Sequence, residues 1–254
     1  PLGPDNILGL VAGALAGTGS YFSGRWLAVG KSPLTGTWGD ANAGGTFAPA
    51  IKRCGYDGIF FYGVSPKPVY LQIDIDGARL EDASDLWGLD AIEAEEALLN
   101  RANCKRQPAA AVIGQSGENL SLISGISNDK GRIAARSGLG AVMGSKKVKG
   151  VLLAGSRPVR VNDPERLKVV KQEHDKMVKS AAKMPIPGWA FRMLGTMAGK
   201  AKTVSPGDGI MTFSVFSKWG TGATNQMGIE MGDSPIKNWS GSNLDFDKKK
   251  SKLY

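Results

Sequence analysis

Two glycine-rich stretches carry most of the residues that can bind a charged ligand. Residues 24–45 (GRWLAVGKSPLTGTWGDANAGG) offer polar side chains between small ones: Arg25, Lys31, Ser32, Thr35, Thr37, Asp40 and Asn42. Residues 117–146 add Arg132, Arg136 and Lys146. Cations, hydroxyls and free backbone N–H groups together bind phosphorylated or polar heterocyclic ligands. The residue types therefore suggest an anion-bearing cofactor between two loops, and a glycine-rich β fold with surface arginines is the alternative interpretation.

Several common sites are excluded by the residues that the sequence lacks. Neither glycine-rich stretch has the spacing of a Walker A loop or of a Rossmann fingerprint. Cys54 and Cys104 stand alone, and no Cys-x-x-Cys occurs. Cysteines of this chain alone therefore cannot ligate an iron–sulfur cluster or a structural zinc ion. His174 is the single histidine, which excludes a metal site built on several histidines, and we expect it on the surface of a charged helix.

The elements that would position these loops follow from apolar runs bounded by glycines. Such runs predict strands at residues 6–16, 25–30, 55–63, 69–75, 109–114 and 150–155. Helices are predicted at residues 46–54, 89–102 and, from Asp163-Pro164, up to about Met184. The inward face of the last helix is expected to hold Leu167, Val170, Met177, Val178 and Ala181.

A weak internal repeat connects the two glycine-rich stretches. Residues 41–63 and residues 136–155 each contain a glycine-rich turn, a short helix-like piece with lysine near its end, and a buried strand between glycines. A basic, strand-like stretch precedes the glycines in both copies. A duplicated α+β unit would bring two arginine-flanked loops together.

The net charge of +9 is concentrated in the second part of the chain. Residues 156–254 hold 17 Lys+Arg against 9 Asp+Glu. Such a segment binds nucleic acid, a membrane surface or an acidic protein, or it is a solvated face. No basic-aromatic pattern of a nucleic-acid-binding type is present, and no apolar run is long enough to span a membrane. We expect neither a nucleic-acid partner nor a membrane span.

Long phrases of the sequence resemble the first domain of tungsten-dependent aldehyde:ferredoxin oxidoreductases. They include GRWLAVGKSPLTGTWGDANAGGTFAPAIKRCGYDGI, KPVYLQI, DASDLWG, IGQSGENL and NDKGRIAARSGLGAVMGSKKVKG, in the family's order. Residues 218–243 resemble the family's next segment more loosely. The resemblance implies an α+β fold of duplicated β-rich units with short helices, followed by a mainly helical or irregular segment. It also implies a tungstopterin-binding domain at 1–160, and a helix, a linker and the start of a second domain at 161–254.

The resemblance implies a tungsten bis-pterin cofactor whose phosphates are bridged by magnesium. Aldehyde and water would become carboxylic acid, and electrons would leave through a [4Fe–4S] cluster to ferredoxin or a ferredoxin-like subunit. The positions that match the family's pterin contacts are Arg25, Asn42, Gly44, Arg132, Ile133, Ala135 and Arg136. Ile133 and Ala135 stand where the family often has Ala and Gly, which leaves those two contacts intact only if the backbone makes them.

The resemblance also implies parts that this chain lacks. The family begins earlier and continues further, and the later part carries the cluster cysteines and the substrate pocket. We therefore expect a fragment, a partial chain or a split subunit that is cytoplasmic, binds the remainder of the enzyme and oxidises no aldehyde alone. A benzoyl-coenzyme A reductase-like subunit is the second interpretation, although KSPLTGTWGDANAGG resembles the aldehyde enzymes more. A non-enzymatic basic binding module is the third.

Overall fold

A computed structural model describes residues 1–104 and 106–181, together with the single positions 193, 220, 240, 241 and 245. The chain divides into two compact units, residues 1–164 and residues 165–254. The linker and the start of a second domain that we expect after the helix lie mostly outside the described residues. The assignment of a tungstopterin-binding domain to residues 1–160, and of a helix, a linker and the start of a second domain to residues 161–254, stays a prediction.

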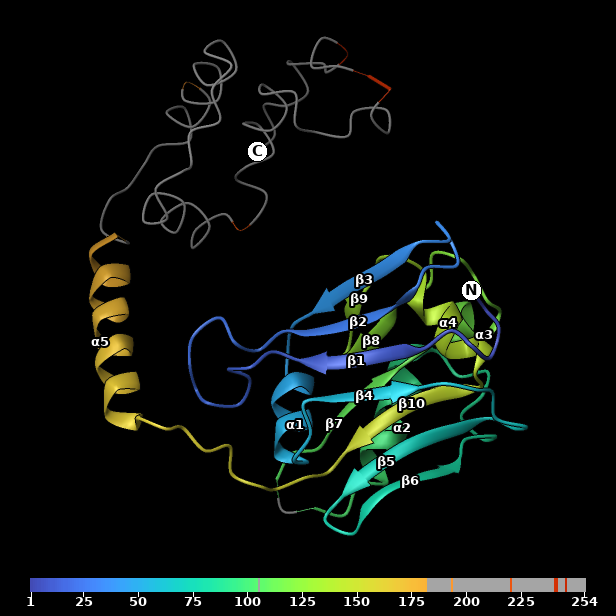
Figure 1. The fold of residues 1–254 in the computed structure, drawn as a ribbon, viewed down its shortest axis with the longest axis horizontal. Coiled ribbons are helices and arrows are strands. Elements are labelled where there is room, and N and C mark those ends of the chain that lie inside the picture. Colours follow the sequence, from blue (N-terminus) through green and yellow to red (C-terminus); the bar gives the residue numbers. More distant parts are fainter. Residues whose placement is uncertain (105, 182–192, 194–219, 221–239, 242–244, 246–254) are drawn as a thin grey trace. The chain divides into compact units, whose positions relative to one another are not determined.

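The first unit begins with a four-stranded antiparallel sheet in the order β3-β2-β1-β4 (Figure 1). A short helix, α1, precedes its last strand. The bounds are β1 (Leu8–Ala12), β2 (Trp26–Lys31), β3 (Trp38–Ala43), α1 (Phe47–Arg53) and β4 (Gly58–Phe61).

A second sheet has six strands in the order β6-β5-β10-β7-β8-β9. β5 and β10 pair in parallel and the other neighbours pair antiparallel. The strands are β5 (Val69–Asp74), β6 (Gly77–Asp82), β7 (Ala109–Val112), β8 (Ile126–Asn128), β9 (Arg132–Ala134) and β10 (Val148–Leu153). The helices are α2 (Ala91–Asn100), α3 (Gln115–Glu118), α4 (Leu139–Ser145) and, after the sheet, α5 (Pro164–Ala181).

The same topology occurs twice. The segment β1-β2-β3-α1-β4 forms a sheet in the order β3-β2-β1-β4. The segment β7-α3-β8-β9-α4-β10, which has one additional short helix, forms β9-β8-β7-β10 within the larger sheet. The pairs β1–β4 and β7–β10 are both antiparallel. The expected α+β fold with duplicated β-rich units is therefore confirmed, and each copy extends further toward the N-terminus than its sequence pattern indicates.

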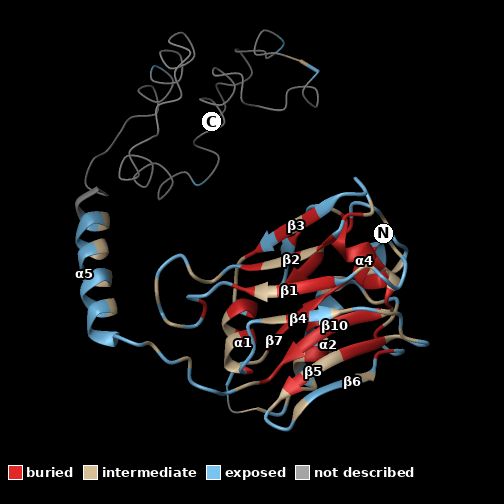
Figure 2. Cartoon of the chain, viewed as in Figure 1, coloured by how far each residue is buried: buried red, intermediate tan, exposed pale blue. Residues whose placement is uncertain are grey.

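The main core lies between the two sheets, where α1 and α4 contact strands of both. β7 shows how the layers form, because successive side chains of a strand point to opposite faces. Ala109 and Ala111 join the core between the sheets, whereas Ala110 and Val112 pack toward α2 on the outer face. Figure 2 shows the central strands as largely buried and β6 as an exposed edge. β7 is covered on both faces, so it reads as a continuous apolar run.

α5 begins at Pro164, as the Asp-Pro pair predicts, and is described up to Ala181. None of its described side chains is buried (Figure 2). Val170 and Met177, which we expected to face inward, are each 52% exposed, and the expectation is wrong for these two. Helical spacing places apolar residues on one face, but it does not supply a surface to cover them. Among the described residues, no helix is both long and apolar enough to cross a bilayer.

Candidate cofactor-binding surface

The first glycine-rich stretch forms a β-hairpin, and its two ends meet. β2 and β3 pair from Trp26 opposite Ala43 to Lys31 opposite Trp38. Arg25 precedes the first of these pairs and reaches Asn42, whose Oδ1 accepts a hydrogen bond from Arg25 Nε at 2.8 Å and another from Nη2. Both side chains are exposed. The hairpin therefore joins two predicted site residues that are 17 positions apart.

Several other polar residues of the two stretches lie elsewhere, which corrects the expectation that each stretch acts as one loop. Ser32, Thr35 and Thr37 belong to the turn between β2 and β3, and strands of this length place that turn about 20 Å from Arg25. Ser32 is buried, and its hydroxyl accepts the N–H groups of Leu34 and Thr35. Lys146 of the second stretch is 2% exposed and donates to the carbonyls of Pro4 and Gly63.

The second copy brings its own edge strand to the same place. β3 and β9 end the two sheets and lie next to each other. A Cβ atom on Gly44 would lie 3.6 Å from Arg132 Nη1, and Ser137 Oγ donates to the carbonyl of Asp40 at 3.1 Å. The exposed residues of β9 and its continuation are Arg132, Ile133, Ala135 and Arg136. The structure therefore places six of the seven predicted site residues along β3, β9 and their continuations, and Arg25 at the start of β2 beside Asn42.

Asn128 joins these two edges from inside the core. Its side chain is fully buried at the end of β8. Trp26 Nε1 donates to Asn128 Oδ1 at 3.1 Å, and Asn128 Nδ2 donates to the carbonyl of Gly44 at 3.0 Å. Trp26 in turn packs edge-on against Phe47 of α1, with ring centroids 5.0 Å apart. A buried amide with both ends bonded fixes the relative position of the groups it joins.

Asp129 holds the start of α1 against the turn between β8 and β9. Its carboxylate accepts the backbone N–H and the hydroxyl of Thr46, both at 2.6 Å. Gly45 makes this approach possible, because its φ is +107° and a Cβ there would lie 1.8 Å from Asp129 Oδ2. Glycine alone adopts such a conformation without strain. The steric requirement in this loop therefore lies on Gly45, next to the predicted contact Gly44.

Glu95 of α2 contacts the same turn between β8 and β9. The side chain is 2% exposed on α2, and its carboxylate accepts the backbone N–H of Lys130 at 2.9 Å. Asp129 and Lys130 both have positive φ, at 47° and 56°, so the turn needs external support. Burial raises the pKa of the Glu95 carboxyl above its ordinary value.

Glu95 should make stability depend on pH. Because the pKa of Glu95 is raised in the folded state, the folded protein binds its proton more tightly than the unfolded chain does. The stabilisation that comes from protonated Glu95 is fully present below the pKa that Glu95 has in the unfolded chain. It is lost as the pH rises through the pKa that Glu95 has in the folded protein. The free energy of unfolding of the wild type should therefore fall relative to Glu95→Gln across that interval, measured by urea unfolding at a series of pH values. A difference that stays constant with pH would contradict the assignment.

The joining residues were not selected by the sequence analysis, although a signal for them was present. Asn-Asp-Lys-Gly at 128–131 is typical of a tight hairpin turn. The motif indicates a turn but not the segment that the turn contacts. Glu95 gave no signal of its own, because it lies in a helix with other acidic residues.

A family profile described as "Aldehyde ferredoxin oxidoreductase, N-terminal domain" matches residues 1–155, which cover both copies of the repeated unit. The chain belongs to the aldehyde ferredoxin oxidoreductase family. The predicted resemblance is thus confirmed, and with it membership in a family of tungsten-containing oxidoreductases.

Relatives within and near this family match most of the chain. The tungsten-containing aldehyde ferredoxin oxidoreductase of Thermococcus kodakarensis is 39% identical over 196 residues, which are 77% of this chain and 32% of the relative. The WOR-like subunit of an aliphatic sulfonate oxidoreductase from Pyrococcus furiosus is 30% identical over 94% of this chain and 35% of its own length. This chain therefore spans about a third of these relatives' length.

A solved structure with the same fold is the active-site complex BamBC of benzoyl-coenzyme A reductase with 1,5-dienoyl-CoA. It matches with a TM-score of 0.70 and 36% identity, over 74% of this chain and 28% of that chain.

The surface fits the phosphates of the cofactor that the family implies. The guanidinium groups of Arg25, Arg132 and Arg136 are exposed, and none has a carboxylate partner within ion-pair distance among the described residues. Such planar groups suit bidentate binding of phosphate. The part of the chain that the structure describes contains no group of three or more His, Cys, Asp or Glu residues placed to hold a metal ion.

Proposed function

We propose that the first unit binds a tungsten bis-pterin cofactor on the edges of β3 and β9, with phosphates bridged by magnesium. The observation that carries the proposal is the set of three exposed arginines, none of which has an ion-pair partner in the described part of the chain, on two edges that Asn128 and Asp129 join. Arg25 and Asn42 would contact the cofactor from the first copy. Arg132 and Arg136 would contact it from the second copy.

The backbone of the edges completes the proposed contacts. Ile133 and Ala135 differ from the residues that the family often has, and both are exposed at the edge of β9. Their backbone N–H and C=O groups would form hydrogen bonds with the cofactor, and these bonds do not depend on which side chains are present. When bound, the cofactor supplies a redox-active metal that exchanges electrons with the substrate, while these residues bind and orient it.

We further propose that the chain serves an enzyme that oxidises aldehydes with water to carboxylic acids and passes electrons to ferredoxin. The cluster that relays the electrons would be a [4Fe–4S] centre held outside this chain. The similarity to the tungsten-containing aldehyde ferredoxin oxidoreductases supports this proposal. The same similarity supports the proposal that this chain binds the remainder of such an enzyme.

A benzoyl-coenzyme A reductase-like function is the second candidate, and the similarity to the BamBC complex favours it. The two candidates differ in substrate, so one assay separates them. The chain purified anaerobically with tungstate, together with the remainder of its enzyme, would be supplied with a viologen dye and either short aldehydes or 1,5-dienoyl-CoA. Dye reduction with aldehydes alone supports the first candidate, and dye reduction with the thioester alone supports the second.

Removing an arginine from the surface should reduce cofactor content. Arg25→Ala and Arg136→Ala are each expected to lower bound tungsten and pterin about tenfold, because a charge-assisted contact with phosphate is lost. Tungsten is measured by mass spectrometry and pterin by fluorescence after oxidation. Arg79→Ala is the matched control, since Arg79 lies in β6, at the opposite edge of the second sheet from β9, and pairs with Asp74 and Glu81. Full occupancy in both surface variants would overturn the assignment.

A further inference from the structure

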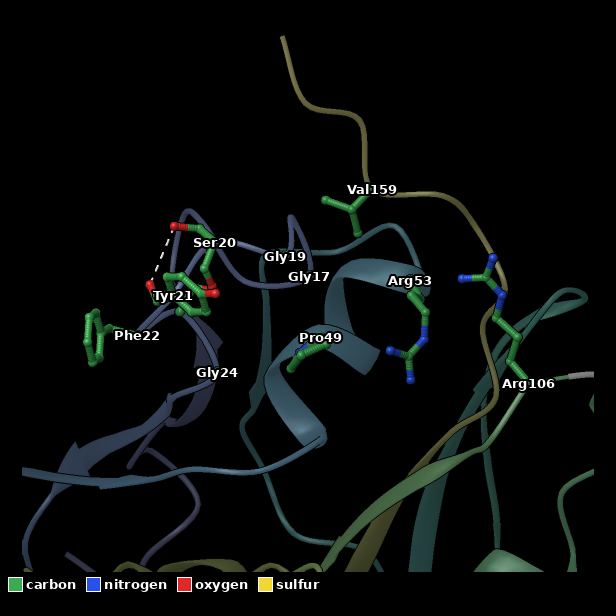
Figure 3. Close-up of a pocket in the computed structure, with 11 residues that line it drawn as sticks. Gly17, Gly19, Ser20, Tyr21, Phe22, Gly24, Pro49, Arg53, Arg106 and Val159 are labelled. Carbon is green, nitrogen blue, oxygen red and sulfur yellow. Dashed lines mark hydrogen bonds between the residues drawn. The ribbon is translucent and has the colours of Figure 1, made fainter. Parts of the chain in front are cut away.

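A second feature of the first unit has the chemistry of an anion site. A cavity of about 460 Å³ opens between the loop that joins β1 to β2 and the C-terminal part of α1 (Figure 3). Its walls are Gly17 and residues 19–24, with Pro49, Arg53, Arg106 and Val159. None of the seven predicted cofactor-binding residues lines it. The cavity is large enough for a small organic molecule, not only for an ion.

Two guanidinium groups with few partners line this cavity. Arg53 is the last residue of α1, and Arg106 lies in the loop before β7 (Figure 3). Arg53 Nε is buried and has no hydrogen-bond partner among the residues that the structure describes, and the bond from Arg53 Nη2 to the carbonyl of Gln107 is long, at 3.5 Å. Within the described part of the chain, neither guanidinium has a carboxylate within ion-pair distance. A buried donor without a partner is costly unless something binds it.

The two positive charges also act on each other. Burial lowers the pKa of Arg53, and the nearby charge of Arg106 lowers it further. The group nevertheless stays protonated, because arginine does not lose its proton in proteins. The folded chain therefore keeps two like charges close together, and an anion between them would relieve both the repulsion and the lost hydration.

The opposite wall of the cavity is a polar turn with an unusual backbone. Ser20, Tyr21 and Ser23 place hydroxyl groups along it. Gly17 and Gly19 have φ of +79°, and Phe22 has φ of +59° although its ring is 86% exposed. A bulky residue in the left-handed region is uncommon, and such residues concentrate at ligand clamps. The Ser20 and Ser23 hydroxyls donate to the carbonyls of Tyr21 and Ser20, so the wall offers their oxygens as hydrogen-bond acceptors opposite the arginines.

We propose that this cavity binds the phosphate group of a small organic molecule, with Arg53 and Arg106 as the two cationic contacts. Two guanidinium groups match the double negative charge and the several oxygens of a phosphate monoester. The hydroxyl groups of the serine and tyrosine wall contact the organic part, which fills the rest of the cavity.

Calorimetric titration of the full chain at constant ionic strength tests this proposal. Inorganic phosphate should bind saturably in this cavity, apart from any binding at the β3–β9 edge, and ribose 5-phosphate should bind the cavity more tightly because its sugar also fills it. Arg53→Gln and Arg106→Gln should each weaken binding about tenfold. Arg160→Gln, an exposed arginine next to Val159, changes the net charge equally and should leave binding unchanged. Arg53→Lys keeps the charge without the planar group, and its affinity should lie between those of the wild type and Arg53→Gln. This variant tests the same contact if Arg53→Gln fails to fold.

Two results would overturn the proposal. Wild-type affinity in the Arg53→Gln/Arg106→Gln double variant would show that the cavity is not used. Loss of binding in Arg25→Gln, with no change in Arg53→Gln, would place phosphate on the β3–β9 edge instead. Equal affinity for inorganic phosphate and ribose 5-phosphate would contradict the organic part of the ligand, whereas tighter binding of the sugar phosphate supports it.

Discussion

Replacing Lys149 by methionine should lower the free energy of unfolding by about 3–5 kcal/mol, because it leaves a buried carboxylate without its partner. Lys149 is fully buried and Glu118 nearly so, and their side chains form an ion pair. Lys149 Nζ also donates to the carbonyl of Leu89 at 2.9 Å, and Glu118 accepts the N–H of Gly88. The pair therefore joins β10, α3 and the loop before α2. Urea unfolding followed by circular dichroism measures the loss.

An exposed pair provides the matched control. Lys67 and Asp82 also form an ion pair, with side chains 60% and 49% exposed. Lys67→Met should change the free energy of unfolding by less than about 1 kcal/mol, as is usual for exposed pairs. The double variant Glu118→Gln/Lys149→Met should recover part of the loss, because it removes the unpaired charge. Equal effects of Lys149→Met and Lys67→Met would show that the buried pair does not stabilise the fold.

Replacing Gly45 by alanine should lower the free energy of unfolding by at least about 3 kcal/mol, because it combines a steric clash with a strained backbone. The added Cβ would lie 1.8 Å from Asp129 Oδ2, at a φ of +107°. The Asp129–Thr46 contact must then open, and the β8–β9 turn would move away from α1. Tungsten and pterin content should fall together with stability, since the turn leads directly into Arg132.

Gly44 gives the comparison for this prediction. A Cβ there meets Arg132 Nη1 at 3.6 Å, an ordinary contact, and its backbone has no positive φ. Gly44→Ala should therefore stay within about 0.5 kcal/mol of the wild type in stability, as most changes away from strained sites do. Adding Asp129→Ala to Gly45→Ala should remove the closest clash and so restore stability in part, because the approach to Asn128 Nδ2 at 2.9 Å and the backbone strain remain. A Gly45→Ala protein as stable as Gly44→Ala would contradict the role of Gly45.

The local patterns of the sequence determined a large part of the fold. Strands at 25–30, 69–75 and 109–114 and the helix at 89–102 appear close to their expected bounds. These elements carry a continuous apolar run, period-two alternation or helical spacing, all of which depend on near neighbours in the chain. The internal repeat was also visible, because each copy needs the same glycines before its buried strand. The phrases of the family then identified the seven predicted site residues.

Tertiary structure decided which of the polar residues share a surface. Residues 24–45 look like one polar loop, but β3 converts them into a hairpin whose ends meet and whose turn lies far away. Lys146 and Lys149 look like surface cations, yet both are buried against carbonyls from distant segments. The contacts of Asn128, Asp129 and Gly45 form only because the second copy of the repeated unit packs against the first. Periodicity and propensity are properties of short segments, whereas the partner that satisfies a buried amide or charge comes from elsewhere in the chain and is fixed only when the two copies pack together.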